Sequence, residues 1–331
     1  MPKKYTARSV IGALILFLVL LFGLSLFVGQ DGNSLLFSEQ SELREAGWFL
    51  LIQLRLPRAL LAMLAGAGLS LCGAVLQGYL RNPLAEPTIL GVSGLGALGA
   101  VLAIFLGWFT IFPYAVPLCA MTLAALCPLI FYVFLRGRWK ISTVILVGIG
   151  ISNFVSAFTA LFLNLMDKNY ARLEIIFWLF GSFADRTLGQ VLTIMQPIFC
   201  GVGLLLYKKR ALDKMSFGEE MAQVLGVRMP AFSMRLILGI VLVIGPIVSL
   251  TGIIGFVGLI VPHMLRFWLG DKPSRLLVPA CLGGALFALG ADIMTRLLPT
   301  HGELKVGVVT ALFGVPVFIQ LVRRMSSDSV Q

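Results

Sequence analysis

The chain alternates between long apolar runs and short polar connections, and this alternation predicts its architecture. A helix that crosses a membrane needs about 20 mostly apolar residues. Ten segments meet or approach that length: Val10–Val28, Arg58–Leu80, Thr88–Thr110, Pro113–Leu135, Ile141–Met166, Leu188–Tyr207, Ala231–Leu250, Gly252–Leu269, Leu276–Leu298 and Val306–Val322. We therefore expect an all-α integral membrane protein, with residues 1–331 forming one polytopic domain. The seventh and eighth spans are the least clearly separated, because only residues 249–252 can turn the chain there.

Small side chains recur on one face of the second span. They occupy every fourth position, at Ala62, Gly66, Ser70, Ala74 and Gly78. Such a ridge lets a neighbouring backbone approach closely, which predicts a packed helix bundle. The corner at residues 81–87 contains two prolines, which end one helix and start the next.

Both halves of the chain contain a helix that Gly and Pro interrupt, at residues 82–99 and 245–262. Five crossings separate the second span from the seventh, so the two halves would have opposite orientations in the membrane. This arrangement predicts an inverted repeat, as in many transporters.

Composition excludes a soluble domain, since 59% of the residues are hydrophobic and only 12% are charged. The net charge of +11 does not indicate nucleic-acid binding, because Lys and Arg occur in short clusters between apolar runs. If the N-terminus is cytoplasmic, 18 of the 26 Lys and Arg residues fall on the cytoplasmic side. The positive-inside rule then places both termini in the cytoplasm.

Motifs for catalysis are missing from the sequence. It contains no GxxxxGK[ST] phosphate-binding loop and no HExxH, and its five cysteines show no CxxC spacing. The GxGxxG at Gly94–Gly99 lies inside an apolar span with no preceding strand, so it indicates helix packing. We expect no catalytic residue, cofactor or metal site in this chain. Uphill transport would need a separate ATPase, and an ion-coupled secondary transporter is the alternative.

Several ordered motifs resemble one family. They are Arg55-Leu56-Pro57-Arg58, Asn82-Pro83-Leu84-Ala85-Glu86-Pro87, Phe217-Gly218-Glu219, and the segments 255–266 and 307–318. Together they resemble the iron-chelate and cobalamin (FecCD-like) class of ABC-importer permeases, over nearly the whole chain.

This resemblance implies a type II importer permease that works as a homodimer in the cytoplasmic (inner) membrane of a bacterium or archaeon. It also implies two ATPase subunits, which bind ATP and Mg, and a periplasmic or lipid-tethered binding protein. The cargo would be an iron-siderophore, haem, cobalamin or a related metal chelate. An oxyanion such as molybdate is the alternative, because no residue in the sequence selects among these cargoes.

The basic connection at residues 209–229 predicts a short amphipathic helix. Ser216 and Glu219 have capping-box spacing, and Gly226 can end the helix. An interfacial helix lying on lipid is one interpretation. The resemblance instead implies a coupling helix on the ATPase, with these contact residues: Phe217, Gly218, Glu219, Glu220, Leu225 and Gly226.

Three arginines, Arg55, Arg58 and Arg296, are expected on the outer face. The resemblance implies that they dock carboxylates of the binding protein, whereas snorkelling interfacial arginines are the simpler alternative. Asp292 is the carboxylate that an ion relay within the membrane could use, and it lies four residues before Arg296. A local ion pair between Asp292 and Arg296 would explain why both charged residues occur in this apolar span.

A path for a bulky chelate needs a wide, weakly binding wall, because tight binding would trap the cargo. We expect such a wall in the fifth and tenth spans, at Asn153, Phe154, Phe158, Val309 and Phe313, although Asn153 also suits an interhelical hydrogen bond. Residues 173–181 are apolar but too short to cross. They predict a half-buried outer helix, which in the resembled family borders the mouth of the path.

Overall fold

The computed structural model describes residues 6–28, 41–112, 114–135, 137, 139–166, 169–298 and 304–328, and no strand occurs among them. Seven helical segments are long and apolar enough to cross a membrane, and three shorter apolar helices accompany them. The long ones are α1 (Ala7–Phe27), α4 (Leu56–Leu80), α6 with α7 (Ala115–Ala125, Cys127–Leu135), α8 (Ile141–Leu165), α10 (Leu188–Leu206), α13 (Met229–Thr251) and α15 (Pro273–Leu297). The shorter ones are α5 (Val92–Phe105), α14 (Val257–Leu269) and α16 (Val306–Asp328). These segments lie at the positions of the ten predicted spans and confirm the all-α membrane fold, while the number of crossings stays a prediction.

Helix α4 lies at the centre of the bundle, and its small residues explain why. A Cβ added at Gly66 would lie 2.1 Å from the carbonyl oxygen of Gly284 in α15. On another face, a Cβ at Gly73 would lie 1.9 Å from the carbonyl oxygen of Gly258 in α14. Only glycine allows these backbones to approach so closely, which confirms the packing predicted from the small-residue ridge.

Two helix breaks lie inside the bundle, where the residues around Pro83 and around Gly252 and Gly255 predicted them, whereas α13 continues unbroken through Gly245 and Pro246. After α4, Arg81 takes a positive φ of 53°, and a short 3-10 turn (η2, Pro87–Leu90) leads into α5. After α13 the chain runs without helix to Phe256, which has a φ of 68° and precedes α14. The seventh and eighth spans are therefore separate, as predicted, but the break falls at residues 252–256 instead of 249–252, because residues 249–251 still belong to α13.

The two breaks contact each other. The Glu86 carboxylate accepts a hydrogen bond from the backbone N–H of Phe256 at 2.7 Å, at the start of α14. Gln77, near the end of α4, donates to the carbonyls of Gly258 (3.3 Å) and Leu259 (3.1 Å). The first interaction satisfies a backbone N–H that the N-terminus of α14 leaves without an intrahelical partner. The Gly258 carbonyl has no i+4 donor because that position is Pro262, so the Gln77 amide supplies one. The inverted repeat stays a prediction.

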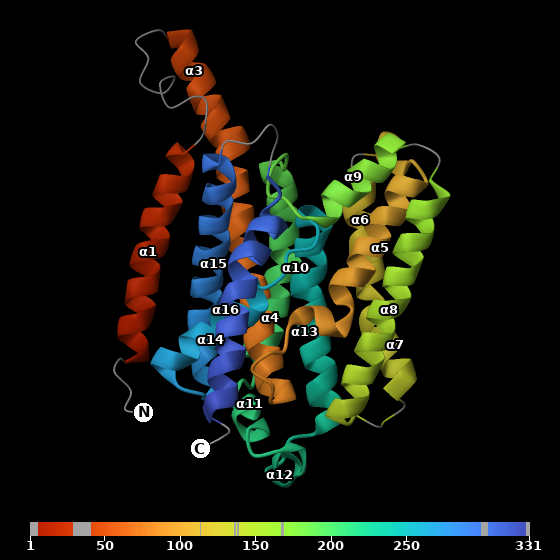
Figure 1. Ribbon diagram of the computed structural model, residues 1–331, viewed down its shortest axis with the longest axis vertical. Helices are drawn as coiled ribbons and strands as arrows, with labels where there is room; N and C mark the ends of the chain where they lie inside the picture. The colour runs from red at the N-terminus through yellow and green to blue at the C-terminus, as the bar shows by residue number, and fades with distance from the viewer. Residues whose placement is uncertain are drawn as a thin grey trace.

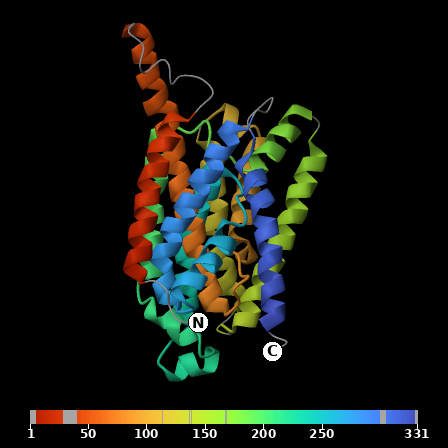
Figure 2. The same cartoon turned by 60° about the vertical axis from the view of Figure 1, so that its left-hand side comes forward.

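The two ends of the bundle differ (Figures 1 and 2). At one end, α3 (Ser41–Leu50) projects beyond the bundle and continues through a π-helical turn (Leu51–Arg55) into α4. The outer helix α9 (Asn169–Leu179) lies at the same end. At the other end lie α11 (Arg210–Met215) and α12 (Glu219–Val224), with the start of α1 and the end of α16. These are called the α3 end and the α12 end below.

Candidate coupling and docking surfaces

The segment at the α12 end has one buried and one exposed side. In α11, Leu212 and Met215 are buried in the core. Around α12, large apolar side chains face outward, with Phe217 72% and Val224 81% exposed. Exposed apolar side chains gathered on one short helix mark an interaction surface. The predicted amphipathic helix is therefore present, and its apolar side is open to a partner.

The acidic residues of this segment hold it to two membrane helices. Asp213 accepts hydrogen bonds from the backbone N–H (2.9 Å) and the hydroxyl (2.7 Å) of Ser274, in the first turn of α15. Glu219 accepts one from the backbone N–H of Ile141, the first residue of α8, at 3.3 Å. A carboxylate at a helix N-terminus satisfies a free N–H and complements the helix dipole. A displacement of α11 or α12 would therefore act directly on α15 and α8.

The predicted capping box is wrong. Ser216 ends α11, and Gly218 stands at the N-cap of α12 without a side-chain cap. Gly218 has φ 105° and ψ 162°, a conformation that essentially only glycine adopts. Since the Glu219 carboxylate turns to α8, the exposed acid of the pair is Glu220. Gly226, with a φ of 85°, follows the exposed Leu225 at the end of α12, as expected.

Two of the three arginines at the α3 end form a cluster around Asp292, whose side chain is 1% exposed. Arg58 Nε lies 2.7 Å from one carboxylate oxygen, and an Arg296 guanidinium nitrogen lies 2.5 Å from the other. The two arginine side chains are 17% and 10% exposed. The predicted ion pair between Asp292 and Arg296 is confirmed, and Arg58, from α4, joins it.

Arginines also cap the end of α1. Arg296 donates to the carbonyls of Ser25 (2.8 Å) and Val28 (3.1 Å) and to the buried Ser25 hydroxyl (2.5 Å). Arg55 donates to the carbonyl of Leu26 at 2.9 Å. The last carbonyls of a helix lack intrahelical partners and carry a partial negative charge, which cations neutralise. These arginines therefore tie α1 to α4 and α15.

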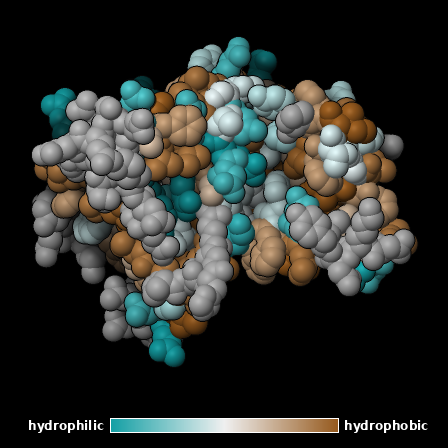
Figure 3. Space-filling view, turned by 90° about the horizontal axis from the view of Figure 1, so that it is seen from above, coloured by the Kyte–Doolittle hydropathy of each residue, from teal (hydrophilic) through white to brown (hydrophobic). Residues whose placement is uncertain are grey.

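Seen from the α3 end, a hydrophilic band crosses the middle of the molecule between apolar flanks (Figure 3). A pocket of about 440 Å³ at this end is lined by residues of α9, by residues 182–186, and by Thr251 and Lys305. Helix α9 is half-buried as predicted, since Ile175 is fully buried and Phe177 is 52% exposed.

The predicted path residues lie on two helices, α8 and α16, and their role stays a prediction. Asn153, Phe154 and Phe158 are exposed on α8, which packs on α5. Phe313 is 53% exposed on α16, which packs on α14 and α15. Val309, on the same helix as Phe313, is 2% exposed and belongs to the core, so it faces no open surface in this conformation.

Two carboxylates with clear structural roles escaped the sequence reasoning. Glu86 lies in the first helix break and accepts a hydrogen bond from the second, although the sequence suggested only a polar corner. Asp213 stands alone among basic residues, which is the signal that could have marked it as a helix cap for another segment.

Known permeases resemble this chain over most of its length. The vitamin B12 import system permease protein BtuC of Klebsiella pneumoniae is 35% identical over 281 residues, which cover 84% of this chain and 83% of that protein. The hemin transport system permease protein HmuU of Yersinia pestis is 32% identical and covers 98% of both chains. An uncharacterized ABC transporter permease protein, YvrB of Bacillus subtilis, is 37% identical over 83% of this chain and 79% of that protein.

A solved structure agrees with these relatives. A metal-chelate type ABC transporter in an inward-facing conformation superposes with a TM-score of 0.84 at 31% identity, covering 96% of this chain and 99% of that one. The FecCD transport family matches residues 13–324. With the fold and the relatives in agreement, the chain belongs to the FecCD transport family.

Proposed function

We propose that this chain is the permease subunit of an ABC importer, with residues 209–229 receiving the ATPase. The observation that carries this proposal is the segment at the α12 end. Its apolar side chains, including Phe217 and Val224, are exposed, while Asp213 and Glu219 fasten it to the first turns of α15 and α8. A partner that moves α12 would therefore move membrane helices. ATP and Mg would bind to that partner.

The proposed cargo is a bulky metal chelate of the haem, cobalamin or siderophore kind. The vitamin B12 and hemin permeases among the relatives support this class. The exposed rings of Phe154, Phe158 and Phe313 suit a weakly binding apolar wall. An oxyanion such as molybdate would favour cationic groups, which this set of residues lacks.

An ion-coupled secondary transporter is the less supported alternative. Such a carrier needs a carboxylate that titrates or coordinates an ion within the membrane. Both oxygens of Asp292 are instead engaged by Arg58 and Arg296. This engagement favours the ATP-driven mechanism.

We propose further that two copies of the chain assemble with two ATPase subunits, and that the α12 end is cytoplasmic. The six Lys and Arg residues between Lys208 and Arg235 support this orientation. The α3 end would then receive a binding protein. The cluster of Arg58, Arg296 and Asp292 keeps a net positive charge, and Arg55 adds to it, so an acidic docking partner fits this end.

Reconstitution tests this function. The full-length chain, its ATPase and its binding protein would be placed in liposomes, and uptake of labelled haem, cobalamin and a ferric siderophore would be followed. We expect uptake of one chelate that requires ATP and all three components. Uptake by the permease alone along an imposed proton or sodium gradient would overturn the proposal.

The coupling segment has its own test. Glu219→Gln removes the carboxylate charge that holds α12 to α8, so it should lower cargo uptake per ATP hydrolysed while the ATPase still binds. Val224→Glu places a charge in the exposed apolar surface and should weaken ATPase binding itself. Thr193→Ala, on the exposed face of α10 and remote from α12, serves as the control. Equal behaviour of all three variants would contradict the assignment.

A further inference from the structure

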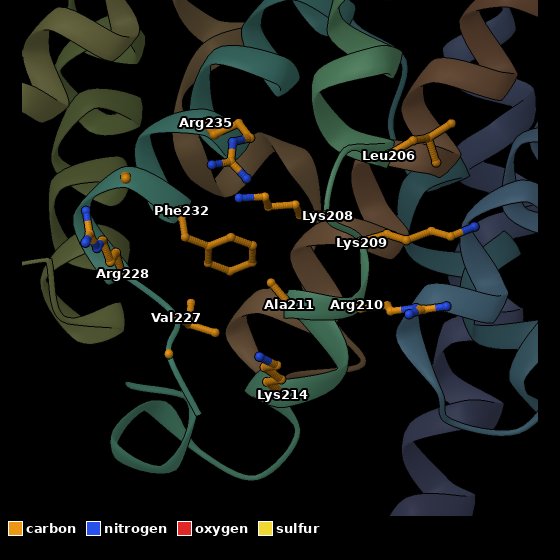
Figure 4. A pocket seen from close by; sticks show the side chains of 12 residues that line it. Leu206, Lys208, Lys209, Arg210, Ala211, Lys214, Val227, Arg228, Phe232 and Arg235 are labelled. Carbon is orange, nitrogen blue, oxygen red and sulfur yellow. The ribbon is translucent and has the colours of Figure 1, made fainter. Parts of the chain in front are cut away.

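A basic pocket of about 800 Å³ opens at the α12 end, between the end of α10, helix α11 and the start of α13 (Figure 4). Six Lys and Arg residues and no Asp or Glu line it. In Figure 4, Lys208 and Arg235 extend toward one another beside the Phe232 ring, and Lys214 lies below them. Lys209 and Arg210 extend to the opposite side.

The acids nearest in sequence do not neutralise this charge. Asp213 faces α15, where it binds Ser274 and lies 3.6 Å from Lys272. Glu219 faces α8. Within the part of the chain that the structure describes, none of the six cations takes part in an ion pair. Clustered like charges repel each other, so the pocket favours an anion.

Aromatic contacts hold the cations at the pocket's upper edge. The ring centroid of Tyr207 lies 5.4 Å from Lys208 Nζ and 5.0 Å from the Arg235 guanidinium carbon. Both distances are within the range of cation–π attraction. Lys208 has a φ of 51°, which turns the chain sharply after α10. Lys214 donates to the carbonyl of Leu225 at 2.7 Å and so connects the pocket to the end of α12.

The pocket lies at the ends of two long apolar helices. Helix α10 ends at Leu206, which lines the pocket, and α13 begins at Met229. Further along the same two helices, Phe199 is 59% exposed and Leu238 is 39% exposed. A cationic rim below an exposed apolar wall matches a molecule with a phosphate group at one end and acyl chains at the other. A soluble anion would use the rim but not the wall.

We propose that this pocket binds the headgroup of an anionic phospholipid. Lys208 and Arg235 hold the phosphate at the membrane surface, and the acyl chains lie along α10 and α13. Basic pockets between membrane helices recognise anionic headgroups in this way. The bound lipid stabilises α11 against α13, and through Lys214 it stabilises the end of α12 as well. The pocket shares part of its lining with the segment proposed to receive the ATPase, so lipid binding is measured on the chain without that partner.

The test measures lipid binding by the purified full-length chain in a neutral detergent. Native mass spectrometry follows titration with phosphatidylglycerol, with phosphatidylcholine of the same acyl chains, and with inorganic phosphate. Phosphatidylglycerol should bind preferentially. The double variant Lys208→Gln/Arg235→Gln should lose affinity on the order of 30-fold, the combined contribution of two basic residues near an anionic headgroup.

Lys272→Gln/Arg275→Gln is the matched control, because it removes the same charge from exposed side chains at the start of α15 that do not line the pocket. It should bind phosphatidylglycerol like the unchanged chain. If Lys208→Gln/Arg235→Gln is not monodisperse, the phosphatidylglycerol affinity of Lys208→Gln alone, a change at an exposed residue, is compared with that of the control.

Three outcomes would overturn the proposal. An equal loss in both double variants would indicate general charge attraction. Displacement of the lipid by millimolar phosphate would indicate a site for a soluble anion. Unchanged lipid binding combined with weaker ATPase assembly in Lys208→Gln/Arg235→Gln would make the pocket a protein contact.

Discussion

Each end of this bundle carries a group of basic residues, and the two groups differ in whether the same chain supplies a counter-ion. At the α3 end, Arg58 and Arg296 share the buried carboxylate of Asp292. At the α12 end, Lys208 and Arg235 line a pocket without any acidic side chain. A cation whose counter-ion comes from the same chain stabilises the fold. A cation group without one attracts something else, here an anionic lipid in our proposal.

Removing the shared carboxylate should have the largest effect. Asp292→Ala leaves two partly buried arginines without a counter-ion, and breaking a buried pair in this way costs about 3–5 kcal/mol. Unfolding of the full-length chain by heat or denaturant in neutral detergent measures the loss. A change within the roughly ±0.5 kcal/mol typical of surface substitutions would contradict the buried cluster.

Removing one arginine should have a smaller and more local effect. Arg296→Gln keeps the pair of Arg58 and Asp292 but removes the hydrogen bonds to Ser25 and Val28. Hydrogen bonds to charged groups contribute roughly 1.5–3 kcal/mol. Hydrogen exchange should accelerate at the end of α1 and stay unchanged in the middle of α15. Arg275→Gln, at an exposed position of α15, is the control and should change neither.

The contributions of the two basic groups to stability should respond differently to salt. Salt screens exposed charges far more than buried ones, so raising salt in neutral detergent should stabilise the chain by relieving repulsion in the basic pocket. The gain, on the order of 1 kcal/mol or less, should shrink in Lys208→Gln/Arg235→Gln. It should persist in Asp292→Asn, which changes only the buried cluster. If Asp292→Asn instead abolished the stabilisation by salt, the salt-sensitive charges would lie in the Asp292 cluster and not in the basic pocket.

The smallest expected effect concerns docking at the α3 end. Arg55→Gln removes one of the proposed contacts to the binding protein, and an exposed ion pair contributes only about 0.2–1 kcal/mol. Association should slow at low salt and be unaffected at high salt, because surface charges govern approach more than affinity. Stopped-flow association with the binding protein measures this. Because Arg55 also caps α1, hydrogen exchange in α1 is measured in parallel, so that a loosened helix end is distinguished from a lost docking contact.

Local sequence determined the spans, the helix breaks and the exposed amphipathic helix, because apolar length, Gly and Pro positions and periodicity act within a few turns of chain. The family motifs added the class of transporter. The first break lies at residues 81–91, around the predicted corner at 81–87, whereas the second begins only at residue 252, beyond Gly245 and Pro246.

Only the tertiary structure decided which charges meet. Arg58 and Asp292 are separated by 234 residues, and Glu86 and Phe256 by 170, so no spacing rule connects them. Glu219 had the right spacing to cap its own helix, yet its carboxylate reaches α8, where a free N–H lies within the fold. A side chain binds the strongest partner within reach of it in space, and that distance is set by how the helices pack. Thus the sequence determined that basic residues lie at both ends of the bundle, whereas packing determined that Asp292 neutralises only those at the α3 end.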